Sequence, residues 1–232
     1  MLQMKDLRMS MNLSLLITRP REFFSELSHC EPSLKWPGLI ITIIAICSGI
    51  MGYQMGELTG RLFSHMMEGM GTITAVFGAG GAFVSTFLMW IIAAVIFFII
   101  QRLLKGTGSF TRVTEITGYG MFPMIISAIA GILLAMHYLP LADVTPVIGS
   151  DPEKINAAVQ SLMTDPALHQ LTLISAILGI ILMIWSANIW AFGLETCCGL
   201  DSRKALIAVG IPVLIYIIYT LVTLFVYTPG GI

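Results

Sequence analysis

The strongest constraint on this chain is a series of apolar runs in which no Asp, Glu, Lys or Arg stands near the middle. A helix of roughly 18–20 such residues is long enough to cross the hydrocarbon core of a bilayer. Only 11% of the 232 residues are charged, whereas soluble domains have roughly 25%, so the chain lacks the polar side chains that a soluble surface needs. The sequence therefore predicts an all-α integral membrane protein, a five-transmembrane-helix bundle. The expected spans are about 39–58, 75–104, 119–138, 167–194 and 205–227.

Two further segments have one apolar face but are too polar to cross a membrane. Before span one, Pro20 suits the first turn of a helix, and Phe23, Phe24 and Leu27 share one face. Between spans three and four, residues 150–163 begin with the spacing of a capping box and continue with apolar residues at helical spacing. We expect both segments to form amphipathic interfacial helices. The Asp-Pro pair that follows the second segment at 165–166 is typical of a helix start and opens span four.

Basic residues are distributed unevenly among the connections between the predicted spans. Ten fall on one side of the membrane, and Arg61 and Lys154 fall on the other. Because cytoplasmic connections are enriched in Lys and Arg, we expect residues 1–36 to form a cytoplasmic or interfacial N-terminal segment. Residues 37–232 would then form a domain of the cell membrane, with the C-terminus outside. The ten residues are Lys5, Arg8, Arg19, Arg21, Lys35, Arg102, Lys105, Arg112, Arg203 and Lys204.

Small residues recur every four positions in two of the spans. Ser48, Gly52, Gly56 and Gly60 form one such stripe, and Gly131 belongs to a second one in span three. A stripe of this kind lets another helix backbone approach closely. We expect packing within the chain, with packing between copies, and hence a homo-oligomer, as the alternative.

Two further features of the membrane domain also concern helix packing. Span two is longer than the bilayer requires, which predicts a tilt, a protruding end or a break at Gly78–Gly81. Asn188 lies at depth in span four, where it is expected to hydrogen-bond another helix rather than a substrate.

The stretch Gly106–Pro123 separates spans two and three and is interpreted as a short inner turn. Its Ile116–Gly120 segment, ITGYG, superficially resembles a potassium-channel filter, in which backbone carbonyls replace the hydration shell of the ion. The filter pattern has Thr before the aliphatic residue, and here the order is reversed. The charge distribution also places the stretch on the inner side, so the sequence disfavours a filter.

The sequence offers little for metal or catalytic chemistry. Several Met and His residues near the outer side have side chains that suit copper or other soft metals, but their spacing is not diagnostic. No GxSxG, HExxH or Walker pattern occurs. We therefore expect no enzyme activity, no cofactor, no metal site and no nucleic-acid partner. The Met and His residues are His65, Met66, Met67, Met70, His137 and His169.

Three motifs resemble the Yip (Ypt-interacting protein) domain family of multi-pass membrane proteins. The first is Pro20-x-x-Phe23-Phe24. The second is Gly106-x-Gly108-Ser109-Phe110 followed by Gly118-Tyr119-x-x-x-Pro123, and the third comprises Trp185, Trp190, Gly193-Leu194, Gly199-Leu200, Ser202 and Lys204-Ala205. The resemblance covers nearly the whole chain in the family's order. It implies a five-helix membrane domain with a cytosolic N-terminus.

Eukaryotic members of that family associate with Rab-type GTPases and act in vesicle traffic and membrane shaping. This chain lacks their long polar N-terminal region, so it is more similar to a bacterial or archaeal member. The predicted function is a non-enzymatic membrane adaptor or organiser that contacts lipid headgroups or a protein on its cytoplasmic face. The alternative is a transporter or channel for a small solute or ion. The candidate contact residues are Arg19, Arg21, Lys105, Arg112, Arg203 and Lys204, and the candidate helix-packing residues are Gly52, Gly56, Gly60, Gly131 and Asn188.

Overall fold

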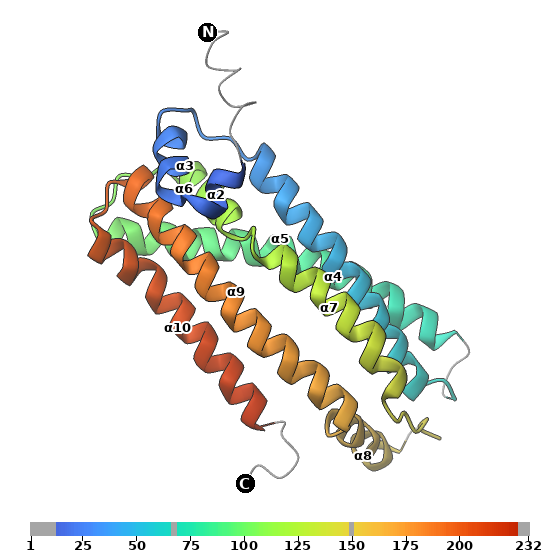
Figure 1. Cartoon of the computed structure of the whole chain (residues 1–232). Helices are drawn as coiled ribbons and strands as arrows, with labels where there is room; N and C mark the ends of the chain where they lie inside the picture. Colours follow the sequence, from blue (N-terminus) through green and yellow to red (C-terminus); the bar gives the residue numbers. More distant parts are fainter. Residues whose placement is uncertain (1–12, 66–68, 149–150, 227–232) are drawn as a thin grey trace. The chain divides into compact units, whose positions relative to one another are not determined.

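A computed structural model describes residues 13–65, 69–148 and 151–226, and within these ranges the chain is helical and has no strand (Figure 1). Five helices are long and apolar enough to cross a membrane by length and composition, which confirms the predicted fold class. These are α4 (Lys35–Leu62), α5 (Met70–Leu103), α7 (Met124–Tyr138) extended by the 3-10 helix η1 (Leu139–Leu141), α9 (Pro166–Cys198) and α10 (Ser202–Val226). The shorter helices are α2 (Leu13–Thr18), α3 (Pro20–Ser28), α6 (Phe110–Gly120) and α8 (Pro152–Met163).

The chain divides into two compact units; α4, α5, α9 and α10 contribute residues to both, and α7 lies in unit 2. Unit 1 comprises the described part of Met1–Thr42 together with Leu88–Pro123 and Met183–Ile215. Unit 2 comprises Ile43–Phe87, Met124–Leu182 and the described part of Tyr216–Ile232. Each unit is described by itself.

Unit 2 is held together by close approach of the backbones of α4 and α5. A Cβ atom at Gly52, Gly56 or Gly60 would overlap backbone atoms of α5, at Gly78, Thr74 and the start of α5 respectively. The Thr74 hydroxyl donates a 2.7 Å hydrogen bond to the Gly56 carbonyl across this interface. The stripe in span one therefore lies against another helix of the same chain.

The second small-residue stripe lies on α7 in the same unit. A Cβ at Gly131 would stand 3.2 Å from the Met51 sulfur, so this glycine lets α4 approach α7. Beside it is a cluster of buried apolar side chains on α4, α7, η1 and α9. Its members are Leu58, Ala135, Leu139, Leu168 and Leu171.

Both helix starts predicted between spans three and four have a capping carboxylate. Asp165 Oδ1 accepts from the backbone N–H groups of Ala167 and Leu168 at 2.9 and 3.1 Å, which confirms that the Asp-Pro pair begins α9. At α8 the cap is Asp151, which accepts from Glu153 N at 3.1 Å. Ser150, the predicted first member of the capping box, lies outside the described residues. No described residue of α8 is buried, as the amphipathic interpretation requires of a surface helix.

The structure corrects the interpretation of the stretch Gly106–Pro123. It is not a short turn, because it contains the 11-residue helix α6, and the third membrane helix begins at Met124 rather than at residue 119. Pro123 has no N–H and disfavours helical backbone in the residue before it, which accounts for the end of α6 and the new start. By contrast, α5 is unbroken across Gly78–Gly81, and Gly78 lies where the α5 backbone approaches Gly52.

Candidate functional site

The centre of unit 1 is the buried helix α6. Ser109 caps it, since its hydroxyl accepts from Arg112 N at 3.2 Å. All nine residues from Arg112 to Gly120 are buried, although five of them are Thr, Gly or Tyr rather than aliphatic. A polar, glycine-containing helix can occupy such a position only if surrounding groups satisfy its polar atoms.

A charged pair stands at the first turn of α6. Arg112 and Glu115 are 7% and 1% exposed, and their side chains meet at 2.7 Å. Arg112 also donates to the Cys30 carbonyl, and Glu115 accepts from the Ser33 backbone N–H at 3.1 Å. The pair thus fastens the connection between α3 and α4 to α6.

Two tryptophan side chains bind the carbonyls of the same helix. Trp90 Nε1 on α5 donates to the Thr114 carbonyl at 3.1 Å, and Trp190 Nε1 on α9 donates to the Thr117 carbonyl at 2.9 Å. Gly120 permits the second contact, because a Cβ there would overlap the Trp190 indole. Each indole therefore fixes the position of α6 by a hydrogen bond to its backbone, within otherwise apolar surroundings.

The amphipathic helix α3 covers α6 and α9. Phe23, Phe24 and Leu27 are buried, and the Phe23 ring packs edge-on against Tyr119 with centroids 5.0 Å apart. A Cβ at Gly193 would come within 3.1 Å of the Phe24 ring, so Gly193 makes room for α3 on α9. The apolar face of α3 therefore packs against protein in unit 1.

The turn between α5 and α6 is joined to the end of α9. The Thr107 backbone N–H donates to the Cys198 carbonyl at 2.9 Å. Gln101 is fully buried and donates to the Gly108 carbonyl at 3.1 Å. Gln101, a polar residue at the end of the apolar run of α5, therefore holds this turn in place.

A family comparison identifies the class of membrane protein to which these features belong. The family model of the Yip1 domain matches residues 14–224. The chain belongs to the Yip1 domain family. It is thus a Yip1-domain multi-pass membrane protein, and the resemblance inferred from its three motifs is confirmed.

A curated relative from the archaeon Methanocaldococcus jannaschii, described as an uncharacterized protein, is 32% identical over 127 residues. The matched region covers 55% of this chain and 90% of the relative. No solved structure matches this chain.

Within this Yip1 domain, the predicted contact residues have different environments. Arg112 is buried in its pair with Glu115, so its guanidinium is not presented at the surface. Arg21 donates to Glu195 on α9 at 2.7 Å and lies over the Phe192 ring, so it ties α3 to α9. Arg19 is exposed and paired with Glu22 at 3.3 Å.

The remaining predicted contact residues, Lys105, Arg203 and Lys204, are exposed on the two turns of unit 1. Lys204 is 3.7 Å from Asp201, and its backbone N–H donates to the same carboxylate at 2.8 Å. These contacts, the backbone hydrogen bond first, lower the pKa of Asp201. Lys105 and Arg203 form no ion pair among the described residues, so their charges are the least compensated of the set.

Two further sets of residues that the sequence analysis considered can be located in the structure. Asn188 is exposed, and no hydrogen bond among the described residues uses its side chain. Within the described ranges, no three His, Cys, Asp or Glu side chains are grouped to hold a metal ion. Met66 and Met67, which belonged to the Met and His set considered for metal binding, lie outside the described residues.

Proposed function

We propose that this Yip1-domain protein is a non-enzymatic membrane adaptor or organiser that uses the basic turns of unit 1 for contact. These turns are 103–109 and 199–204, and the Thr107–Cys198 hydrogen bond joins them. The buried ionisable groups of unit 1, Arg112 and Glu115, already bind one another and nearby backbone. They are therefore part of the scaffold and are not arranged as an acid or base facing a substrate.

The observation that carries this proposal is the conformation of Lys105. Its φ angle is 68°, a left-handed conformation in which glycine is the preferred residue at the end of a helix. A side chain there costs roughly 1 kcal/mol, and the lysine is exposed and unpaired among the described residues. A residue that keeps a strained backbone conformation and an uncompensated charge favours a role in binding a lipid headgroup or a protein partner. A basic residue at a membrane surface contributes roughly 1 kcal/mol of attraction to anionic headgroups, and it suits an acidic protein surface equally.

The experiment places a photo-crosslinking amino acid at Lys105 or at Arg203 in the full chain within native membranes. Lys154, an exposed lysine on α8 in unit 2, is the matched control position. We expect a defined protein or anionic-lipid adduct at 105 and 203 that is missing at 154. No adduct at either turn, or the same adducts at all three positions, would remove the proposal.

The alternative function, transport through glycine-lined spans one and two, has a weaker basis in unit 2. The glycine stripe of α4 is filled by the backbone of α5 and does not line an open path. Measurable solute flux in liposomes containing the purified protein would nevertheless favour transport over the adaptor role.

A further inference from the structure

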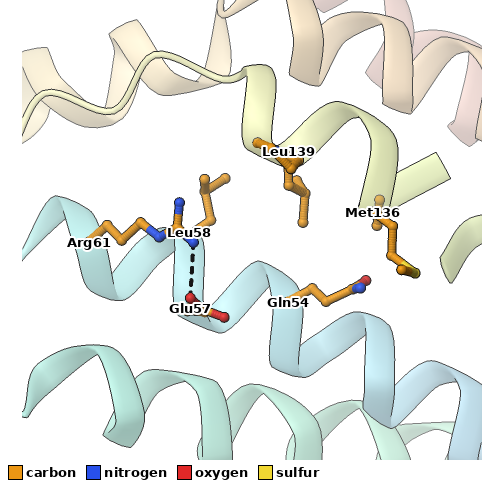
Figure 2. Close-up of a pocket in the computed structure, with 8 residues that line it drawn as sticks. Gln54, Glu57, Leu58, Arg61, Met136 and Leu139 are labelled. Atoms are coloured by element: carbon orange, nitrogen blue, oxygen red, sulfur yellow. Dashed lines mark hydrogen bonds and ion pairs between the residues drawn. The ribbon is translucent and has the colours of Figure 1, made fainter. Parts of the chain in front are cut away.

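A pocket of about 240 Å³ lies in unit 2 between the last turns of α4 and the end of α7 with η1 (Figure 2). Its volume far exceeds the roughly 30 Å³ that one water molecule occupies in the liquid. One wall is polar, with Gln54, Glu57 and Arg61 on α4. The opposite wall is apolar and is formed by Ala135, Met136, Leu139 and Pro140.

The polar wall has hydrogen-bonding capacity that the described residues do not use. Gln54 Oε1 is buried and has no hydrogen-bond partner among them. Figure 2 shows the Gln54 amide extending from α4 toward Met136, into the pocket. A buried carbonyl oxygen without a donor is costly, so this position favours a ligand that brings one.

The ion pair of Arg61 and Glu57, next to Gln54, adds a charged donor and a charged acceptor to the polar wall. Arg61 donates to Glu57 at 2.9 Å, and among the described residues neither side chain has another hydrogen bond or ion pair. A guanidinium has five N–H donors and a carboxylate has two acceptor oxygens, so both retain capacity. Arg61 suits a phosphate, whereas Glu57 and Gln54 Oε1 suit an ammonium or a hydroxyl group.

An apolar track leads away from the pocket along α7. Ile129, Leu133 and Met136 are exposed and follow one another at three- and four-residue spacing on one face of the helix. Such a stripe on a candidate membrane helix faces the acyl chains of lipid. Polar groups at the end of a span with an apolar track beside them match an amphipathic ligand better than a soluble one.

We propose that this pocket binds one phospholipid whose headgroup ends in a hydrogen-bond donor, as ethanolamine or glycerol headgroups do. The phosphate contacts Arg61, and the terminal ammonium or hydroxyl donates to Gln54 Oε1 and Glu57. An acyl chain follows the α7 stripe. Phosphatidylcholine provides the phosphate but has no N–H on its quaternary ammonium, so it leaves Gln54 Oε1 unsatisfied.

The test measures lipid binding to the purified, delipidated full chain by native mass spectrometry. Phosphatidylethanolamine and phosphatidylcholine with the same acyl chains are titrated separately. We expect one bound phosphatidylethanolamine per chain, with an affinity about tenfold higher than for phosphatidylcholine, which is the scale of one charge-assisted hydrogen bond. Equal affinity for the two lipids would overturn the proposal.

Variants assign the binding to this pocket. Gln54→Leu and Arg61→Gln are each expected to lower phosphatidylethanolamine affinity about tenfold, while Gln160→Leu on the exposed face of α8 leaves it unchanged. A thermal unfolding scan shows whether each variant is folded. If Arg61→Gln does not fold, Glu57→Gln is a milder substitution that takes its place. Unchanged affinity in the folded pocket variants, or the same loss in Gln160→Leu, would contradict the assignment.

A competition experiment with a soluble compound distinguishes a lipid ligand from a free phosphorylated amine. O-phosphoethanolamine in large excess is expected not to displace the lipid, because it lacks the acyl chains that follow α7. Displacement at concentrations comparable to that of the lipid would overturn the lipid assignment.

Discussion

Units 1 and 2 belong to one membrane domain, yet they are held together by different interactions. In unit 1, the side chains of Trp90 and Trp190 donate to the backbone of α6, and backbone groups of residues 30–33 bind its charged pair. In unit 2, α4 and α5 meet backbone to backbone, and glycine makes the contact possible. Lipid tails are as apolar as Leu, so apolar burial alone gives helices in a membrane little reason to associate. The helices of unit 1 associate through hydrogen bonds, and those of unit 2 associate through close approach of helix backbones.

The most severe test of unit 1 is Arg112→Ala. Glu115 is 1% exposed, and losing its partner leaves an uncompensated buried charge, which typically costs about 3–5 kcal/mol. Denaturant unfolding of the purified protein in detergent micelles measures the change. Replacing both residues, as Arg112→Met with Glu115→Leu, is expected to cost less, because no orphan charge remains. The exposed Arg203→Ala is the control, and a loss no larger than in that variant would refute the importance of the pair.

The corresponding test of unit 2 is Gly56→Ala. The added Cβ would overlap the backbone at Thr74 and Ala75, and overpacking of this kind costs about 1–3 kcal/mol. Gly80 on α5 has open space where a Cβ would stand, so Gly80→Ala is expected to be neutral or slightly stabilising. If both variants unfold at the same denaturant concentration, the close approach of α4 and α5 does not hold unit 2 together.

Trp190→Phe separates hydrogen bonding from apolar packing in unit 1. The phenyl ring keeps most of the apolar contact, including that with Phe97, whose ring centroid is 5.1 Å from the Trp190 ring centroid, but it cannot donate to the Thr117 carbonyl. Loss of a buried hydrogen bond predicts a destabilisation of about 1–2 kcal/mol. Trp36, which is exposed, provides the control substitution Trp36→Phe. Similar stability of the two variants would mean that the indole contributes by its volume alone.

The smallest expected effect is that of Thr74→Val in unit 2. The substitution keeps the shape but removes the hydroxyl that donates to the Gly56 carbonyl, and hydrogen bonds between membrane helices average about 0.6 kcal/mol. Thr220→Val is the matched control, because that hydroxyl donates to the Tyr216 carbonyl of its own helix, whereas the Thr74 hydroxyl reaches Gly56 on α4 as well as Met70 of its own helix. A loss of several kcal/mol on Thr74→Val would show that unit 2 depends on polar contacts as unit 1 does.

The sequence predicts the elements whose signal is long or periodic. Apolar runs define the five candidate spans, and Asp165 with Pro166 marks the start of α9. The burial of α6 was not predictable, because Thr, Gly and Tyr have modest helix propensity and the helix forms where partners from four other segments satisfy it. Asn188 differs from α6: a polar residue within a span predicts a hydrogen bond to another helix, whereas its side chain is exposed and makes no hydrogen bond among the described residues. The burial of α6 and the exposure of Asn188 both depend on which segments pack nearby, so local sequence alone does not predict either.

The long-range contacts of α3 also impose an order of events on the synthesis of the chain. Arg21 binds Glu195, which is 174 residues later in the sequence, so at about 5–20 residues per second α3 waits on the order of 10–35 s for this partner. Cys197, whose sulfur donates to the Phe24 carbonyl, is equally distant. Tyr119, against which Phe23 packs, is made earlier, but Phe24 lacks its surface at Gly193 until nearly the end of that interval. The first helices to be made are thus among the last to dock, and their apolar face needs the lipid interface, or a chaperone, as a temporary partner during biogenesis.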